Sequence, residues 1–386
     1  MTRVLVVVLV LAAALAGGAA SASSTDVVHA IVWQGRTMSL ATLDATSFEP
    51  RGRLFALGRA QGSVSTDRRG DTLAIASAGT GIAVVDTRRM KVLWRLDRGR
   101  LVRSLSWVSP TRLLVLEHGG VLLLDTAKKR IVARAEFDGL VLASHRWARG
   151  VVVLAFPNEG SIEPARLVVV GPGVRVRTVE LSRVAAGWAS GPTTTHDFNR
   201  AQPGLAVDAG GGRAFVAGGP HLATIDLSSL GVSYSGSERA LQKLSTGPRR
   251  SAVWLGSGLL AVAGADDRLV GDTVTTTPLG LRFVTPDGVR LIDDRVTDVR
   301  AAAGLVLAYG HRYTSGRYEG AGLAAYDRAG TLRWRLFDDA SIGSVPVAAG
   351  RAYVSTGDGL SVVELATGQI LAAVARPWRT FIVGGD

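Results

Sequence analysis

The chain of 386 residues contains no cysteine. This absence excludes disulfide bonds, thiolate zinc sites, a cysteine nucleophile and a lipid anchor attached through cysteine. Lysine is also scarce, because 40 of the 44 basic residues are arginines. Beyond the N-terminal segment, no uninterrupted apolar run reaches the ~18 residues that a membrane-spanning helix needs. The hydrophobic fraction of 47% and the charged fraction of 20% exclude a disordered chain.

The N-terminal segment has the pattern of a secretory signal peptide. Arg3 supplies a positive charge, residues 4–16 form an apolar run, and Ala20-Ser21-Ala22 resembles a cleavage site. We therefore expect residues 1–22 to be removed and residues 23–386 to form one mature domain, secreted or held in the cell envelope. An uncleaved anchor helix is the alternative, although the apolar run is short for a membrane span.

The net charge of +12 bears on the partners of such a protein. A basic exported protein can adhere to anionic surfaces. However, arginine excess together with abundant alanine, glycine and valine is what a biased nucleotide composition produces. The longest dense basic run is Lys128-Lys129-Arg130. Binding to nucleic acid is therefore not favoured.

A short pattern recurs along the rest of the chain: an apolar strand, a tight turn, a second apolar strand, a polar turn and a third strand. Clear copies occupy residues 73–96, 113–137, 214–234 and 352–374. An acidic residue ends the second strand in six copies, at Asp44, Asp86, Asp125, Asp226, Asp327 and Glu364. Two further copies, near Gly171 and Thr285, lack the acid. The copies recur roughly every 37 to 60 residues, which is the spacing of propeller blades.

The composition of the strands supports the same architecture. Runs such as 113–116 and 167–170 are apolar throughout, as expected for strands whose two faces are both buried between neighbouring blades. We predict an all-β chain with a single closed β-propeller of eight four-stranded blades, with seven blades as the alternative. The first copy lacks an opening strand and residues 378–383 have no partners of their own. We therefore expect the C-terminal strand to close the first blade.

Three segments carry a family resemblance. Residues 357–372 (GDGLSVVELATGQILA) and 328–337 (RAGTLRWRLF) resemble the PQQ-like repeats of quinoprotein-type propellers. Residues 207–227 (VDAGGGRAFVAGGPHLATIDL) resemble the related YVTN-type repeat. The resemblance extends over essentially the whole mature chain and implies the propeller architecture. Quinoprotein alcohol dehydrogenases also have a vicinal disulfide beside the cofactor, which this chain lacks, and no residues here match ligands for the quinone or its calcium ion. No cofactor is predicted.

The longer connections are all predicted on one face of the ring. If the strands of a blade are named a to d, the a–b and c–d turns share one face, and the b–c turns and d-to-a connections share the other. Five long segments therefore lie together on blades four to seven. Three are b–c connections (157–165, 265–278 and 311–321) and two are d-to-a connections (182–203 and 236–250). One-sided insertions often mark a binding face. Tolerated variation of surface loops is the alternative.

These long segments contain the candidate ligand-binding residues. They combine aromatic surfaces, arginine and polar side chains, a mixture that suits a glycan, a protein or a cell-envelope polymer. The candidates are Trp188, His196, Asp197, Asn199, Arg200, His311, Arg312, Tyr313 and Tyr318. We expect a monomer that acts as a binding module.

Patterns of catalytic chemistry are weak. The sequence contains no HExxH zinc-protease motif and no GxSxG nucleophile elbow. His196 and His311 are predicted on the same face, where they could share a metal ion. The doublets Asp266-Asp267, Asp293-Asp294 and Asp338-Asp339 lack the alternating acids of calcium loops, although a calcium ion within 265–278 is an alternative. A non-catalytic binding module is preferred, and a propeller enzyme (a lyase, hydrolase or oxidoreductase) with its site in the same loops or the central channel is the rival hypothesis.

Overall fold

The computed structural model describes most of the chain as β-strands. The described residues are 27–59, 64–77, 81–96, 102–147, 150–158, 160–190, 198–236, 248–270, 273–314, 317–356, 359–375 and 379–382. The predicted signal peptide, residues 1–22, lies outside them. Within the described residues, no helix has the length and apolar character needed to cross a bilayer.

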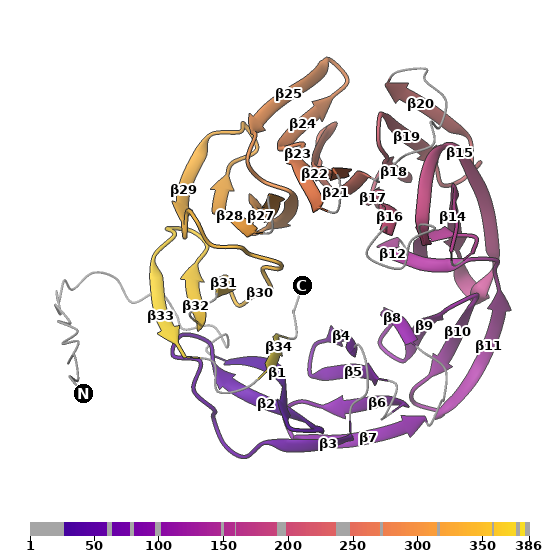
Figure 1. The fold of residues 1–386 in the computed structure, drawn as a ribbon. Helices are drawn as coiled ribbons and strands as arrows, with labels where there is room; N and C mark the ends of the chain where they lie inside the picture. Colours follow the sequence, from indigo (N-terminus) through magenta and orange to yellow (C-terminus); the bar gives the residue numbers. More distant parts are fainter. Residues whose placement is uncertain are drawn as a thin grey trace, which may run out of the picture.

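Eight sheets stand around a central axis (Figure 1), and each sheet is one blade. The strands of blades 1 to 4 are given in their order in the sheet, and the first strand of each blade lies nearest the axis (Figure 1). Blade 1 consists of β34 (Arg379–Ile382), β1 (Val27–Gln34), β2 (Thr37–Asp44) and β3 (Phe55–Arg59). Blade 2 consists of β4 (Val64–Arg69), β5 (Thr72–Ser77), β6 (Gly81–Asp86) and β7 (Lys91–Leu96). Blade 3 consists of β8 (Val102–Ser109), β9 (Arg112–Glu117), β10 (Gly120–Asp125) and β11 (Arg130–Glu136). Blade 4 consists of β12 (Leu140–Trp147), β13 (Gly150–Phe156), β14 (Ile162–Val170), β15 (Val176–Ser190) and β16 (Phe198–Ala201), with a short 3₁₀ turn, η1 (Pro172–Val174), before β15.

Blades 5 to 8 complete the ring in the same order. Blade 5 consists of β17 (Gly204–Asp208), β18 (Arg213–Ala217), β19 (His221–Asp226) and β20 (Val232–Gly236). Blade 6 consists of β21 (Pro248–Gly256), β22 (Leu259–Val270), β24 (Leu281–Thr285) and β25 (Gly288–Asp293), with β23 (Thr273–Pro278) paired to β22. Blade 7 consists of β26 (Asp298–Ala302), β27 (Leu305–Thr314), β28 (Arg317–Tyr326) and β29 (Leu332–Leu336). Blade 8 consists of β30 (Val347–Ala348), β31 (Arg351–Thr356), β32 (Gly359–Glu364) and β33 (Ile370–Val374).

The ring closes as predicted. The C-terminal β34 pairs antiparallel with β1, with Ala30 opposite Ile382 and Trp33 opposite Arg379. Blade 1 is thus built from both ends of the propeller, which removes the open edge that either end would otherwise present. The prediction of eight blades is confirmed. Blades 4 and 6 differ from the prediction of four strands because each contains a fifth.

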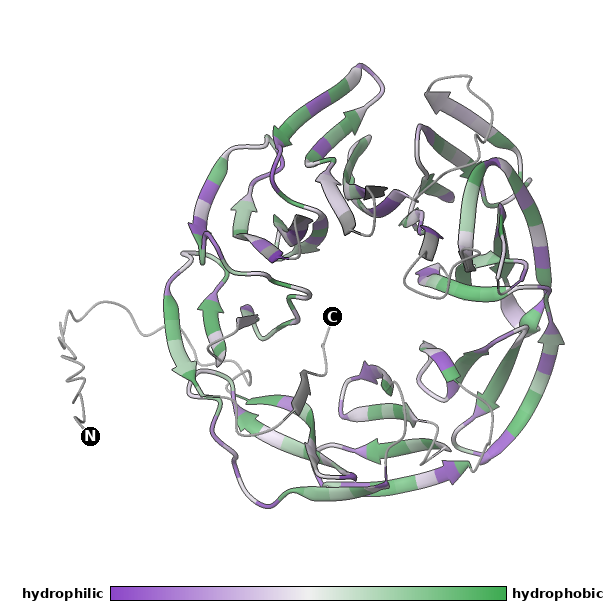
Figure 2. Ribbon diagram, viewed as in Figure 1, coloured by the Kyte–Doolittle hydropathy of each residue, from purple (hydrophilic) through white to green (hydrophobic). Residues whose placement is uncertain are grey.

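The core is divided among the blade interfaces. Eight clusters of buried apolar side chains occur, and each lies between two neighbouring blades. Every residue of β13, for example, is buried, because its alternate side chains face blades 3 and 5. In Figure 2 the middle strands are largely hydrophobic, whereas outer strands such as β7 and β11 carry hydrophilic bands. This arrangement explains why the inner strands read as continuous apolar runs.

The recurrent acids have a structural role at the turn after the third strand of a blade, which is the second strand of the pattern found in the sequence. Asp86 Oδ1 accepts hydrogen bonds from the backbone N–H groups of Arg88 and Arg89, at 3.0 and 2.9 Å. Asp226 Oδ1 accepts the equivalent bonds from Ser228 and Ser229. Such hydrogen bonds favour the ionised form, so the pKa of Asp86 lies below its ordinary value. The acid that marks the repeat is therefore a turn-capping residue.

Candidate functional site

Three of the five long segments, 182–203, 265–278 and 311–321, form hairpins. These three were predicted as loops, and for them this prediction is wrong in its secondary structure. Residues 237–247 of the segment 236–250 lie outside the described residues.

β15 continues to Ser190 and pairs with β16, β22 continues to Val270 and pairs with β23, and β27 and β28 extend their pairing to Thr314 and Arg317. We call the side of the ring that carries these hairpins the insert face, and the opposite side the turn face. The polar, threonine-rich segments lack the apolar pattern of core strands, but pairing in register satisfies their backbone groups.

The β15/β16 and β22/β23 hairpins both form polar contacts with β21, the innermost strand of blade 6. Past the end of β16, the backbone of Gln202 exchanges hydrogen bonds of 2.8 Å with the carbonyl of Pro248 and the N–H of Arg250 on β21. The adjacent Arg249 donates to Asp267 of the β22/β23 hairpin at 2.9 Å, and Arg250 pairs with Asp266 at 2.7 Å. The inserts therefore form a continuous polar arc from blade 4 to blade 6.

His311 lies on β27 of the neighbouring blade 7 and interacts electrostatically with Arg249 and Asp267. Its pKa is lowered mainly by burial and then by the positive charge of Arg249, while Asp298 and Asp267 act in the opposite direction. Thr276 also donates to Asp267, at 2.7 Å. Asp267 therefore already accepts hydrogen bonds from Arg249 and Thr276. It is one of the carboxylates of the segment 265–278, for which a calcium ion was the alternative.

A pocket of about 550 Å³ opens on the insert face where blades 6, 7 and 8 meet. Its walls come from four connections: the end of β23, the segment after β25, the β27/β28 hairpin and the segment after β29. The lining residues are Pro278, Asp294, Arg295, Arg312, Glu319, Gly320, Asp338 and Asp339. Six of the eight are charged, which makes the pocket suited to a polar or charged ligand.

A buried ionic network fixes the connection that supplies Asp294 and Arg295. Asp293, almost completely buried, accepts hydrogen bonds from the Tyr326 hydroxyl at 2.6 Å and from the Arg335 guanidinium. Burial acts to raise the pKa of Asp293, but these bonds and that from the Arg295 N–H outweigh it and hold the pKa below its ordinary value. The wall of the pocket is therefore anchored by an ionised carboxylate inside the protein.

Gly320 allows two walls of the pocket to meet. A Cβ atom at this position would collide with the backbone of Ala340 and Asp339. The β28 strand therefore approaches the segment after β29 closely, which no other residue type permits without a shift of the backbone. This contact places Arg312 and Glu319 of the hairpin in the same pocket as Asp338 and Asp339.

The pocket carries an excess of unpaired negative charge. Arg312 and Glu319 form an ion pair with each other, and Arg295 lies 3.8 Å from Asp293. Within the described part of the chain, the side chains of Asp294, Asp338 and Asp339 form no hydrogen bond or ion pair, and all three residues are exposed. The surface of a strongly basic protein thus contains a locally acidic pocket.

The predicted ligand residues are divided between two blades. Trp188 and Arg200 pair across the β15/β16 hairpin of blade 4, whereas His311, Arg312 and Tyr313 lie on β27 of blade 7. Trp188 packs edge-on against Phe156, with ring centroids 4.8 Å apart, and so contributes to the core between blades 4 and 5. Of the nine predicted residues, Arg312 lines the pocket. His196 and Asp197 lie outside the described residues, as do the side chains of Asn199 and Tyr318.

Seven of the eight pocket residues were not among the predicted ligands. Asp294, Asp338 and Asp339 belong to acidic doublets that were weighed as calcium loops. Their position was the better signal, because both doublets follow the outermost strand of adjacent blades and so must lie on the same face. Among the described residues, no group of three histidine or acidic side chains is placed to hold a metal ion.

Comparison with known proteins supports the fold. No protein-family model and no curated protein matches the sequence. The computationally designed Ika8 protein superposes with a TM-score of 0.52 at 10% identity, over 89% of this chain and 96% of that one. The dihydro-heme d1 dehydrogenase NirN gives 0.54 at 15%, over 95% and 75%. Quinohemoprotein alcohol dehydrogenase from Comamonas testosteroni gives 0.53 at 11%, over 82% and 67%.

This chain is an eight-bladed β-propeller. At such low identities the likeness concerns the architecture alone, because propellers of one fold carry unrelated functions. The neighbours include both a designed protein and enzymes, so function has to be argued from this chain's own residues.

Proposed function

We propose that the protein is an exported, non-catalytic propeller that binds a partner through the insert face, with the pocket between blades 6, 7 and 8 as the principal contact. The observation that carries this proposal is the pocket itself, which is open, largely charged and bounded in part by the predicted insertions 265–278 and 311–321. Its lining contains arginine and carboxylate side chains but no histidine, serine or cysteine. All four lining carboxylates are exposed to solvent, whereas a catalytic carboxyl group is usually tuned by burial, so the set supports recognition better than acid–base catalysis.

The charge of the pocket defines the chemistry of the partner. Arg335 interacts electrostatically with Asp338, but the three aspartates of the pocket form no ion pair in the described part of the chain. These three carboxylates favour a ligand that presents ammonium or guanidinium groups, because each such group would form a charge-assisted hydrogen bond. The Arg312–Glu319 pair adds one donor and one acceptor for neighbouring polar groups. A partially deacetylated glycan and a basic peptide both match this description.

The test uses ligand pairs that differ only in charge. Two pairs of ligands are compared in a thermal-shift titration of the mature chain. Chitotetraose with free amino groups is compared with its fully N-acetylated form, and tetralysine is compared with the same peptide acetylated on all four side-chain amines. A ligand at ~100 times its dissociation constant stabilises the folded state by about 2.7 kcal/mol, enough for a clear rise in Tm. We expect a rise with at least one amine and none with its acetylated partner.

A matched pair of variants assigns the effect to the pocket. Asp338→Asn with Asp339→Asn should abolish the rise. Asp287→Asn with Glu136→Gln removes the same charge from exposed positions outside the pocket and should preserve it. A panel without any charge-dependent rise, or a rise that survives the pocket variant, would refute the proposal.

A further inference from the structure

The positive charge of the chain is concentrated in one part of the ring. Residues 27–137, which form blades 1 to 3, contain 18 lysine and arginine residues against nine acidic residues. Residues 138–386 contain 25 basic against 22 acidic residues, over more than twice the length. The acidic residues are equally dense in both parts. A bias in nucleotide composition would act on the whole chain. It therefore does not explain why the excess of lysine and arginine is concentrated in blades 1 to 3.

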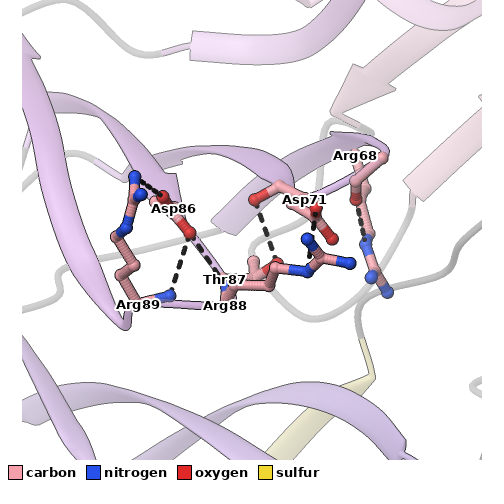
Figure 3. Close-up of polar contacts among 7 residues, drawn as sticks. Arg68, Asp71, Asp86, Thr87, Arg88 and Arg89 are labelled. Atoms are coloured by element: carbon pink, nitrogen blue, oxygen red, sulfur yellow. Dashed lines mark hydrogen bonds and ion pairs between the residues drawn. The ribbon is translucent and has the colours of Figure 1, made fainter.

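Much of this surplus lies on the turn face. In blade 2 the β4–β5 and β6–β7 turns lie side by side, because the Thr87 N–H donates to the Asp71 carbonyl at 2.8 Å (Figure 3). Arg88 pairs with Asp71 at 3.2 Å and Arg89 with Asp86 at 3.4 Å. The aspartates of these turns are therefore already neutralised by nearby arginines.

Blades 1 and 3 repeat this arrangement. Asp44 pairs with Arg51 in blade 1, and Asp125 pairs with Arg112 at 3.4 Å in blade 3. Within the described residues, six further cations at these turns are exposed and form no ion pair. We call them the basic turn patch: Arg53, Arg69, Lys91, Lys128, Lys129 and Arg130. Glu49 is the only carboxylate of the same turns that is likewise unpaired in the described part of the chain.

The shape of the patch favours a flat partner. Five of its residues lie at short turns of blades 2 and 3, and Arg53 lies in the longer connection between β2 and β3 of blade 1. The long hairpins of the ring project from the opposite face. Recognition of single-stranded nucleic acid relies on exposed aromatic side chains that stack on bases. The one aromatic residue in the described turn-face connections of blades 1 to 3, Phe48, instead packs against Tyr353, with ring centroids 5.7 Å apart. A planar array of phosphate groups fits an even, non-aromatic, cationic surface.

We propose that the basic turn patch is an electrostatic docking surface for an anionic lipid bilayer. Cations near an anionic membrane contribute additively to attraction, and the attraction weakens with salt. Docking through the turn face directs the insert face and its pocket away from the membrane. The propeller would thus hold its ligand site toward the surrounding medium while remaining at the bilayer surface.

Vesicle sedimentation tests this proposal with the mature chain from Ser23. Vesicles of phosphatidylcholine with 30% phosphatidylglycerol (~30% is enough for a strong surface potential) are compared with pure phosphatidylcholine. We expect binding to the anionic vesicles alone, and its loss when the salt concentration rises several-fold. Failure to bind anionic vesicles at low salt would overturn the proposal.

Charge-matched variants locate the surface. Lys128→Glu, Lys129→Glu and Arg130→Glu together should weaken vesicle binding at least ~100-fold, because each lost cation contributes about a fivefold factor and the new carboxylates add repulsion. Arg36→Glu, Arg200→Glu and Arg317→Glu change the net charge equally at exposed positions of the insert face, and should retain most of the binding. Equal loss in both triples would show that net charge alone acts and would overturn the assignment.

Two further readouts separate this proposal from its rivals. Duplex DNA that binds more tightly than anionic vesicles, and loses binding in the same patch variant, would replace the bilayer by a nucleic acid and overturn the proposal. The pocket variant Asp338→Asn with Asp339→Asn should leave vesicle binding unchanged. Circular dichroism and Tm of each variant verify that a loss of binding is not a loss of folding.

Discussion

Blades 1 to 3 and blades 4 to 7 are built from the same repeat but have diverged on opposite faces. In blades 1 and 3, two residues connect the second strand to the third, whereas blades 6 and 7 extend the same connection into hairpins. The unpaired charge of the first region is positive and lies on the turn face. The second region instead gathers three unpaired carboxylates, Asp294, Asp338 and Asp339, in a pocket on the insert face. The buried core of a blade tolerates little change, so variation accumulates at the two ends of its strands.

The largest expected effect concerns the buried network of blade 6. Asp293→Ala leaves the Arg335 guanidinium without its carboxylate inside the protein, which should cost about 3–5 kcal/mol of unfolding free energy. Asp86→Ala in blade 2 removes a turn carboxylate at the surface and should lower Tm much less. Equal shifts of Tm for the two variants, measured by thermal unfolding, would contradict a special role for the network.

The next effect is a pH dependence centred on blade 1. Burial, and then the charge of Arg68, lower the pKa of His29 to about 4, from the ordinary value of 6.5. The unfolded chain therefore takes up a proton before the folded one, and stability present above pH ~6.5 is lost as the pH falls towards 4. The loss from His29 is at most about 3 kcal/mol.

His29→Gln should flatten this part of the stability curve, measured by urea unfolding between pH 7 and pH 4.5. His311→Gln on the insert face is the matched comparison. The His311 side chain is only partly buried, so its removal should change the slope less. A curve unchanged by His29→Gln would show that the acid sensitivity arises elsewhere, for example from the turn aspartates, whose contribution is lost only at lower pH.

The smallest effect on stability is expected from the hairpins. Replacing residues 311–320 by an Asn-Gly turn converts the blade 7 connection to the short form of blade 3. The ion pair that is lost, Arg312–Glu319, is half-exposed and worth about 0–1 kcal/mol. We expect Tm to change by only a few degrees while binding of the amine ligands disappears. A large drop in Tm would mean that the hairpin supports the blade itself.

The architecture was predictable because it depends on local patterns repeated eight times. Apolar runs such as 113–116, turn acids such as Asp125 and the unpartnered C-terminal segment together predicted the blades and their closure. The face that carries the insertions followed from strand alternation alone. Even so, the sequence pattern did not show that the threonine-rich segment 273–278 is a strand, because its pairing with β22 is what makes it one.

The sequence by itself thus determined the all-β ring, favoured eight blades over seven and indicated the side of the ring on which to search. Only the tertiary structure decided which side chains meet. Asp294, Arg312 and Asp338 come from three separate connections and share a pocket because neighbouring blades bring their ends together. Trp188, by contrast, packs on Phe156 because its strand continues the blade 4 sheet. Convergence of residues distant in the chain depends on the closed ring, and no local pattern encodes it.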